Sequence, residues 1–249
     1  MDLSFLPQDA ALWDYIAALQ PSQPQQPFLT YFDFLPNKSV TVSTHTRGQF
    51  WDLAMRAVAL IRQVAASNGN SSIKGLRMVH YLSGNIVEDL AIRCASVFLG
   101  TIPVTINWQA DVEAQIHYKI TATDSAIIFV DQRTPDVHKL REMYPTKAVI
   151  NVDNIHTTEP ITAADLEAYL RNAATTKAIP LADDVRCVIF TSGTTGHPKG
   201  VELSYANYRT NRGTFESFLG LEDPDMTFVP VVVNPMHHTN STSITDWYD

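Results

Sequence analysis

The chain has 249 residues, of which 45% are apolar and 18% are charged. This length and composition are typical of a globular protein with a sizeable core and exclude a disordered chain. The formal net charge of −8 argues against a nucleic-acid partner, which needs clustered Lys and Arg. It leaves open a small anionic ligand, because backbone amides and one lysine can hold a phosphate.

No stretch of the sequence resembles a targeting or membrane segment. The start of the chain, MDLSFLPQDAALWDYIAAL, is acidic and has no Lys or Arg before Lys38, whereas secretory and mitochondrial signals need basic residues. The longest apolar runs, such as residues 228–233, are too short to span a bilayer. Cys94 and Cys187 are far apart and in no CxxC spacing, which favours a reducing compartment. We therefore expect a cytoplasmic protein with no transmembrane segment.

The first elements in chain order are a short helix, a connector, a strand and a long helix. Residues 9–19 have the pattern of an amphipathic helix, and the Pro/Gln-rich stretch 20–27 is predicted to be a connector. SVTVSTH, which begins at residue 39, alternates like a strand. Thr46 and Gln49 then form a candidate capping box, and apolar residues recur at helical spacing behind it until Asn68 and Gly69.

Short apolar strands then alternate with helices. The predicted strands are RMVHYL, IPVTIN, SAIIFV and KAVINV, and the helices between them include one that ends near Leu99 and one near residues 111–120. This alternation predicts an α/β fold of βαβ units with a largely parallel, buried sheet. In such sheets, ligands bind outside the carboxyl ends of the strands. Residues 153–184 are predicted to be a surface connector with one short helix.

A loop of small residues follows the next predicted strand, VRCVIF. The stretch FTSGTTGHPKG at 190–200 combines hydroxyl side chains and glycines with Lys199. Glycine lets the backbone approach a ligand closely, so this loop suits phosphate oxygens, and the lysine adds one compact positive charge. The spacing G-x-x-G-x-x-K differs from a Walker A loop, which opens a helix. Because GVELS continues as a second strand, we predict a hairpin-like loop, with a helix from about Ser204.

Composition alone leaves two interpretations of this loop, a phosphate cradle and an exposed flexible turn. The longer stretch FTSGTTGHPKGVELSYANY, however, resembles the phosphate-loop motif of the AMP-forming acyl-activating enzymes. This superfamily contains acyl-CoA synthetases, luciferases and the adenylation domains of peptide synthetases. Two weaker resemblances keep the family's order along the chain, FLGTIPVTINWQAD upstream and NPMHHTNS downstream. The resemblance implies the α/β fold of the large N-terminal domain of these enzymes.

The resemblance also implies a two-step ligase reaction, of the kind that serves fatty acid metabolism. A carboxylic acid attacks the α-phosphorus of ATP, and the acyl-adenylate then passes its acyl group to a thiol, commonly coenzyme A. Mg²⁺ would bridge the phosphates, and no residue of this chain is assigned as a metal ligand. Lys199 matches the family's loop lysine and is implied as catalytic. The residues that match the phosphate cradle are Thr191, Ser192, Gly193, Thr194, Thr195, Gly196 and Lys199.

The adjacent histidines His237 and His238 have no Cys, Asp or His partner at metal-ligand spacing. A buried, hydrogen-bonded histidine is the ordinary interpretation of either residue. By resemblance, His238 occupies the family's histidine position beside the acyl and α-phosphate site and is implied as catalytic. His237 precedes it, in the acyl pocket. Thr239 and Ser241 stand where the family has glycines, which leaves the acyl specificity open. The histidines interpreted as surface or structural are His45, His80, His117, His138, His156 and His197.

PMHHTN has no aspartate to hold an α-amino group, which favours the acyl-CoA synthetase type over a peptide-synthetase domain. The resemblance assigns residues 1–249 to the N-terminal part of an adenylation domain, and we expect the C-terminal small domain to be absent. This chain alone is then expected to be inactive and to self-associate through an uncovered apolar surface. Three functions stay open: an acyl-activating ligase complete only in a longer chain, a non-catalytic ATP- or pyrophosphate-binding module, and a remnant that acts through protein contacts.

Overall fold

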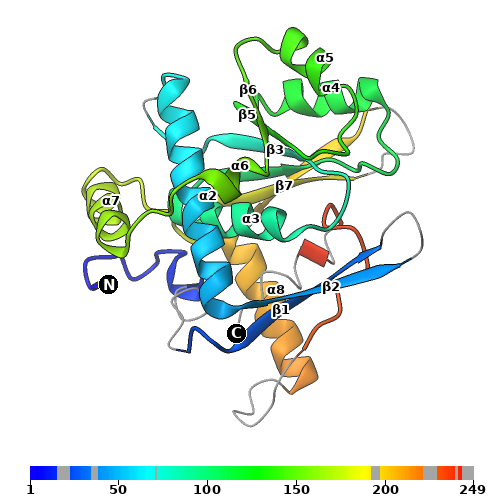
Figure 1. Cartoon of the computed structure of the whole chain (residues 1–249). Helices are drawn as coiled ribbons and strands as arrows, with labels where there is room; N and C mark the ends of the chain where they lie inside the picture. The colour runs from blue at the N-terminus through cyan, green and yellow to red at the C-terminus, as the bar shows by residue number, and fades with distance from the viewer. Residues whose placement is uncertain are drawn as a thin grey trace.

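The computed structural model describes residues 1–15, 23–34, 39–70, 72–191, 197–220, 229–238 and 241–242. Its centre is a six-stranded sheet with the strand order β6-β5-β3-β4-β7-β8 (Figure 1). The strands are β3 (Arg77–Tyr81), β4 (Ile102–Thr105), β5 (Ile127–Val130), β6 (Ala148–Asn151), β7 (Val185–Thr191) and β8 (Lys199–Ser204). All neighbours pair in parallel except β7 and β8, which are antiparallel. The predicted α/β fold with a largely parallel sheet is confirmed.

Helices cover both faces of this sheet, as a parallel sheet requires. Along β3, successive side chains point to opposite faces. Met78 packs in one apolar cluster with residues of the first two helices, and Val79 packs in a second cluster with residues of α4 and α5. The helices around the sheet are α2 (Arg47–Ser67), α3 (Val87–Leu99), α4 (Glu113–Ala122), α5 (Val137–Met143), α6 (Asn154–Thr157), α7 (Ala163–Thr175) and α8 (Tyr205–Leu219).

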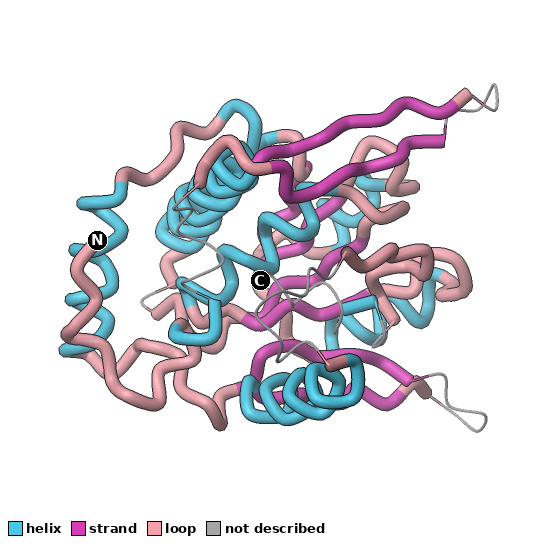
Figure 2. The backbone as a smooth tube through the Cα atoms, turned by 90° about the horizontal axis from the view of Figure 1, so that it is seen from below, coloured by secondary structure: helices cyan, strands magenta, loops and turns pink. Residues whose placement is uncertain are grey.

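The predicted hairpin after β7 and the helix that follows it are confirmed. Strands β7 and β8 pair from Val185 to Thr191, and α8 begins after Ser204. The Ser204 hydroxyl accepts from the Asn207 backbone N–H at 3.2 Å, and the Asn207 side chain accepts from the Ser204 N–H at 2.9 Å. These reciprocal bonds satisfy two free donors at the start of α8. Strand β8 lies at the edge of the sheet. Helix α8 follows β8 directly in the sequence and lies beside it (Figure 2).

A second, two-stranded sheet lies apart from the central one (Figures 1 and 2). Strand β2 (Val40–Thr46) was predicted from its alternation and is confirmed, whereas its antiparallel partner β1 (Pro27–Phe34) was not predicted. The Thr46–Gln49 capping box is also confirmed, with its two bonds at 2.8 and 3.2 Å. Helix α2 thus starts at the residue where β2 ends.

The N-terminal helix predicted over residues 9–19 lies only partly in the described residues, where a single helical turn occupies residues 13–15. Residues 16–22 lie outside them. The predicted Pro/Gln connector over 20–27 ends in a turn at 23–26, directly before β1. Between residues 153 and 184, where one short helix and a surface position were expected, the chain forms α6 and α7. Leu166 and Leu170 of α7 are fully buried in the larger apolar cluster.

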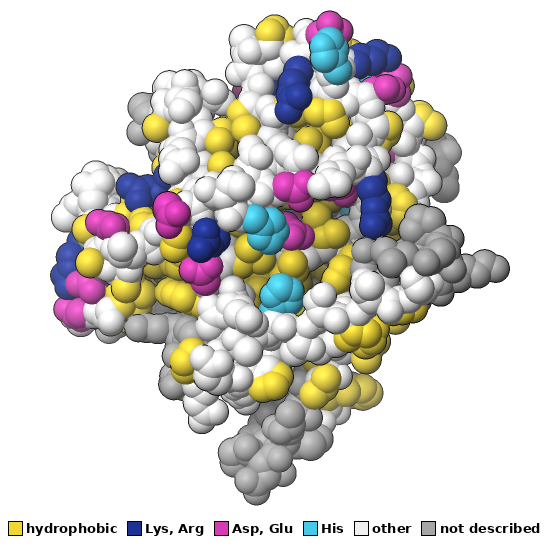
Figure 3. Space-filling model, viewed as in Figure 1, with side chains coloured by type: hydrophobic (Ala, Val, Ile, Leu, Met, Phe, Trp, Pro, Cys, Tyr) yellow, Lys and Arg dark blue, Asp and Glu magenta, His cyan; other side chains and the backbone are white. Residues whose placement is uncertain are grey.

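No helix of the described ranges is long and apolar enough to cross a bilayer. Cys94 and Cys187 are both buried free thiols. On the face seen in Figure 3, hydrophobic side chains lie across the middle of the molecule, with histidine, basic and acidic side chains around them. Large apolar side chains are also exposed on and beyond α8, among them Phe218 at 83% and Val233 at 82%. Self-association through such a surface remains a prediction.

From the burial of α7 we predict that this helix contributes to the free energy of unfolding. Leu166→Ala removes a fully buried side chain and is expected to lower the free energy of unfolding by about 2–5 kcal/mol, because it leaves a cavity in the core. Leu219→Ala is the matched control, since Leu219 at the end of α8 is 39% exposed. Urea unfolding of both variants measures the difference. Equal, small losses would show that α7 lies on the surface without supporting the core.

Candidate functional site

The candidate site lies where the parallel strands β3, β4 and β7 end. These carboxyl ends share one edge of the sheet because the three strands run in the same direction. The phosphate-loop motif leaves this edge after Thr191, at the end of β7. The histidine motif lies beside the turn that follows β3, where Asn85 contacts it. The two motifs are therefore attached to the same sheet edge at the ends of β7 and β3, with the end of β4 between them.

The base of the phosphate loop is a closed hairpin. Thr191 and Lys199 face each other as the last pair of the β7–β8 ladder, and the Thr191 hydroxyl donates to the Lys199 carbonyl oxygen at 3.4 Å. The Lys199 side chain is exposed and makes no ion pair with any residue that the structure describes. Its ammonium group is thus available to an anion held by the loop. Ser192, Gly193, Thr194, Thr195 and Gly196 lie outside the described residues, and their predicted roles stay predictions.

Helix α4 supports both sides of this loop base. The Lys119 ammonium lies 5.0 Å from the centre of the Phe190 ring, and the Tyr118 ring stacks on His197 at 4.6 Å and 16°. Lys119 is buried and also pairs with Asp111. Gly200 lies opposite Phe190, and a Cβ at this position would come within 3.2 Å of the Phe190 ring. The glycine of the motif therefore lets the second strand close against the first.

The two histidines of the downstream motif differ in exposure. His237 is buried, with 8% of its surface exposed, whereas His238 is exposed. Their rings are 4.5 Å apart. The motif's backbone is fixed by Asn85, whose amide donates to the Asn234 carbonyl oxygen at 3.0 Å and accepts from the Met236 N–H at 2.8 Å. His237 therefore lines the interior of the site, while His238 is open to solvent and to any ligand beside it.

One of the two positions where glycines were expected has a structural role. The Ser241 hydroxyl donates to the Asn234 carbonyl oxygen at 2.9 Å, and the Thr242 hydroxyl lies 2.8 Å from the Met236 carbonyl oxygen. These bonds fold the end of the segment back onto its start. Thr239 lies outside the described residues.

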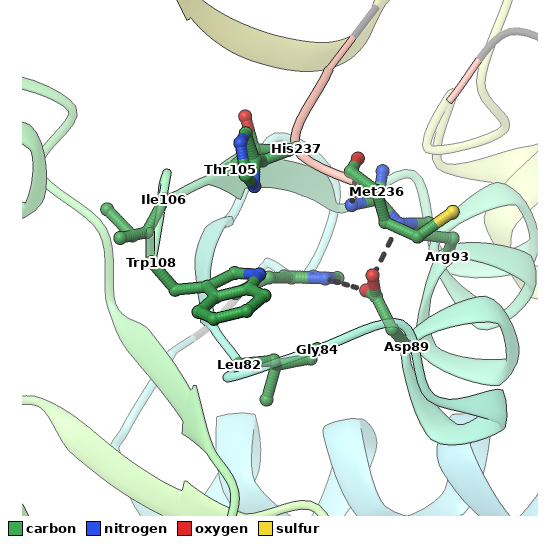
Figure 4. A pocket seen from close by; sticks show the side chains of 10 residues that line it. Leu82, Gly84, Asp89, Arg93, Thr105, Ile106, Trp108, Met236 and His237 are labelled. Carbon is green, nitrogen blue, oxygen red and sulfur yellow. Dashed lines mark hydrogen bonds and ion pairs between the residues drawn. The ribbon is translucent and has the colours of Figure 1, made fainter. Parts of the chain in front are cut away.

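A buried charged cluster joins β3, α3 and the histidine segment (Figure 4). His80 Nδ1 lies 2.6 Å from Asp89 Oδ1, and Arg93 Nε donates to the same oxygen at 3.1 Å. Arg93 Nη2 also donates to the Met236 carbonyl oxygen at 3.4 Å. All three side chains are at most 4% exposed. A negative and a positive charge are thus compensated inside the protein, as buried charges must be.

The protonation states in this cluster follow from burial and charge. Burial opposes the ionisation of Asp89, but Arg93 and His80 outweigh it and lower the pKa of the carboxyl to about 2. Burial also lowers the pKa of His80 below its usual value, although the Asp89 hydrogen bond acts in the opposite direction. The pKa of His237 is lowered to about 4, first by burial and then by His238. At neutral pH, Asp89 is therefore charged and both histidines are neutral.

These groups line a pocket at the carboxyl ends of β3 and β4 (Figure 4). Its lining residues are His80, Leu82, Gly84, Asp89, Arg93, Thr105, Ile106, Trp108, Met236 and His237. From the sequence, His237 was predicted to lie in a pocket and His80 was interpreted as surface or structural. Asp89, Arg93 and Trp108 were not predicted as site residues. A signal was present, because Asp89 and Arg93 stand four residues apart in a helix whose other buried positions are apolar except for Ser96.

In the described part of the chain, no three His, Cys, Asp or Glu side chains come together as a metal site. The site thus combines an exposed cation at the loop base with a mostly neutral pocket at the neighbouring strand ends. This arrangement suits a ligand with a strongly anionic part and an uncharged part.

The chain is similar to known proteins of one family. The family model of AMP-binding enzymes matches residues 23–247. The 2-succinylbenzoate–CoA ligase of Oceanobacillus iheyensis is 25% identical over 164 residues, which are 65% of this chain and 30% of that protein. A putative acyl-CoA synthetase of Bacillus subtilis, YngI, is 24% identical over 205 residues, with 70% and 36% covered. The chain thus spans about a third of the length of these curated relatives.

Solved structures show the same fold. O-succinylbenzoate coenzyme A synthetase (MenE) from Bacillus subtilis, in complex with AMP, aligns with a TM-score of 0.68 at 21% identity, over 93% of this chain and 51% of that one. The inhibitor-bound N-terminal domain of FACL13 from Mycobacterium tuberculosis aligns with a TM-score of 0.65 at 19% identity, over 96% and 55%. Because the family model covers nearly the whole chain, this chain belongs to the family of AMP-binding enzymes.

Proposed function

We propose that this chain carries the triphosphate-binding and acid-binding part of a ligase that activates a carboxylic acid with ATP and then transfers the acyl group to a thiol. One observation carries the proposal: the closed Thr191–Lys199 loop base and the His237 pocket are fixed at neighbouring strand ends of one sheet edge. A triphosphate at the first and a carboxylic acid at the second would meet between them.

The physical difficulty in the first step is that two anions must approach each other. Positioning and charge neutralisation are therefore the main contributions that a protein makes to this chemistry. Lys199 supplies a compact cation at the start of β8, where it can stabilise departing pyrophosphate. The Thr191 hydroxyl at the end of β7 is within reach of the same loop. Both residues are held by the hairpin ladder, so their positions are set before any ligand binds.

The acid is proposed to lie against the two histidines. His238 is exposed and next to His237, so it can contact the carboxylate, while His237 faces the interior and shapes the pocket. The names of the curated relatives, a 2-succinylbenzoate–CoA ligase and a putative acyl-CoA synthetase, support coenzyme A as the thiol. A role in fatty acid metabolism is part of the same proposal.

Family membership also implies ATP and Mg²⁺. The exposed ammonium of Lys199 and the backbone hairpin around it fit a triphosphate. Mg²⁺ supplies further neutralisation of phosphate charge when it accompanies ATP. No described residue is assigned to coenzyme A.

A second function is a non-catalytic module that binds ATP or pyrophosphate. The observation that favours it is the closed loop base with the exposed Lys199, which is the part of the site that such a module needs. A module of this kind would bind the triphosphate through the loop and would not form an acyl-adenylate. A remnant that acts through protein contacts would bind neither.

The role of Lys199 is tested by substitution. Lys199→Ala is expected to weaken ATP and pyrophosphate binding by this chain, and to lower carboxylate-dependent ATP–pyrophosphate exchange by about 10²–10³-fold in a protein that has this activity, because one preorganised electrostatic contact is lost. Equilibrium dialysis with labelled nucleotide and an exchange assay measure the two effects.

Lys177→Ala is the matched control, because Lys177 is exposed and lies after α7. Nucleotide binding without exchange in a longer protein that contains this chain would select the non-catalytic module. Equal binding by Lys199→Ala and Lys177→Ala would remove Lys199 from the site.

A separate prediction concerns His237. His237→Ala is expected to change the order of preference among short, aromatic and long-chain acids more than the affinity for ATP, because the side chain is buried in the pocket and not at the loop. Competition between pairs of acids in the exchange assay gives the order. His138→Ala is the control, since its side chain is 87% exposed on α5. A uniform loss for every acid, together with weaker ATP binding, would contradict the assignment.

A further inference from the structure

The pocket contains a histidine whose orientation and tautomer are fixed by its neighbours. His80 lies on the face of β3 that also carries Met78, and its ring meets Phe129 edge-on at 5.9 Å and 80°. Asp89 Oδ1, ionised and 2.6 Å away, accepts a hydrogen bond from Nδ1. The proton of the neutral imidazole is therefore on Nδ1, and Nε2 is a hydrogen-bond acceptor.

That acceptor has no partner among the residues that the structure describes. His80 Nε2 and both ring nitrogens of His237 are buried and make no hydrogen bond. Each buried polar atom left in this state costs on the order of 1–3 kcal/mol. Because Asp89 and Arg93 compensate each other, and both histidines are neutral, the pocket offers uncharged hydrogen-bonding atoms and no net charge.

The space beside these nitrogens is small. It has room for about one water-sized group. Leu82 and Ile106 contribute apolar walls, and Trp108, which is 37% exposed, lies toward the solvent (Figure 4). A single hydroxyl group at the tip of a longer ligand fits this space, and the rest of that ligand can extend past Trp108.

We propose that His80 is a specificity-determining residue, which accepts a hydrogen bond at Nε2 from an uncharged hydroxyl group at the far end of the acid substrate. This inference rests on the proposed function, because it assumes that the ligand of the pocket is a carboxylic acid. His80 selects for such an acid over one with a methyl end, which leaves the acceptor unpaired. It also selects against a second carboxylate, because the one cation among the lining residues, Arg93, is already paired with Asp89.

The test measures binding to the 249-residue chain without nucleotide. The probes are ω-hydroxyalkanoic acids of increasing length, each matched with the alkanoic acid that has a methyl group at the same position and with the corresponding dicarboxylic acid. Calorimetry gives affinities, and quenching of Trp108 fluorescence, absent in Trp108→Phe, locates the ligand. We expect one hydroxy acid to bind about tenfold or more tighter than its two matches, since pairing one buried acceptor is worth that much.

His80→Leu keeps the approximate volume of the side chain and removes the acceptor. It is expected to abolish the preference for the hydroxyl while the methyl-ended acid still binds. His80→Gln, which retains a hydrogen-bonding side chain, should keep part of the preference, and His138→Leu on exposed α5 should keep all of it. Near-ultraviolet circular dichroism and thermal unfolding confirm that each variant is folded.

Three outcomes would overturn the inference: equal binding of each matched set by the unmodified chain, an unchanged preference in folded His80→Leu and His80→Gln, or no binding by any acid, which would mean that water alone occupies the pocket. The proposed ligase activity is tested by a separate measurement, the pyrophosphate exchange. A hydroxyl preference that survives Lys199→Ala, in a longer protein that contains this chain and shows no pyrophosphate exchange, would support His80 and count against adenylation.

Discussion

The buried carboxylate of Asp89 is the constraint on which the rest of the site depends. A charge at 3% exposure is stable only if it is paired and hydrogen-bonded. Arg93 on the same helix and His80 on the neighbouring strand supply those partners. Arg93 then reaches the Met236 carbonyl oxygen, so the same cluster fixes the segment that carries His237. Loss of any one member would leave a buried group unpaired, and the position of the histidine motif would change with it.

The two halves of the site are supported from opposite faces of the sheet. On one face, α3 holds the histidine segment through Arg93, while on the other, α4 holds the loop base through Lys119 and Tyr118. Strand β4 lies between β3 and β7 and ends in Thr105, which lines the pocket. A ligand that reached from the pocket to the loop would therefore cross the end of β4. Its two ends would be held by α3 and α4, two helices whose buried residues belong to different apolar clusters.

The elements predicted correctly from the sequence have local signals, whereas the features that were not predicted depend on packing between distant residues. The capping boxes at Thr46 and Ser204 and the hairpin ending at Lys199 are set by residues within a few positions. Strand β1 has a weak local pattern and depends on its partner β2, and the burial of α7 depends on distant core residues. His80 was missed for the same reason, since its partner Asp89 lies on another element. Within the candidate site, the motif residues Thr191, Lys199, His237 and His238 were predicted from the sequence, and the fold shows where they lie.

The two ends of the candidate site differ in charge. The chain has a formal net charge of −8, which disfavours the approach of ATP, so a local cation such as Lys199 must act at short range. The pocket end has no net charge, because burial keeps His80 and His237 neutral and the charge of Asp89 compensates that of Arg93. A cation there would compete with Lys199 for the phosphates. In the proposed function, a neutral pocket avoids this competition and leaves recognition of the acid to hydrogen bonds and shape. The lowered pKa values of the two histidines would then help to keep the anionic and uncharged parts of the ligands in separate places.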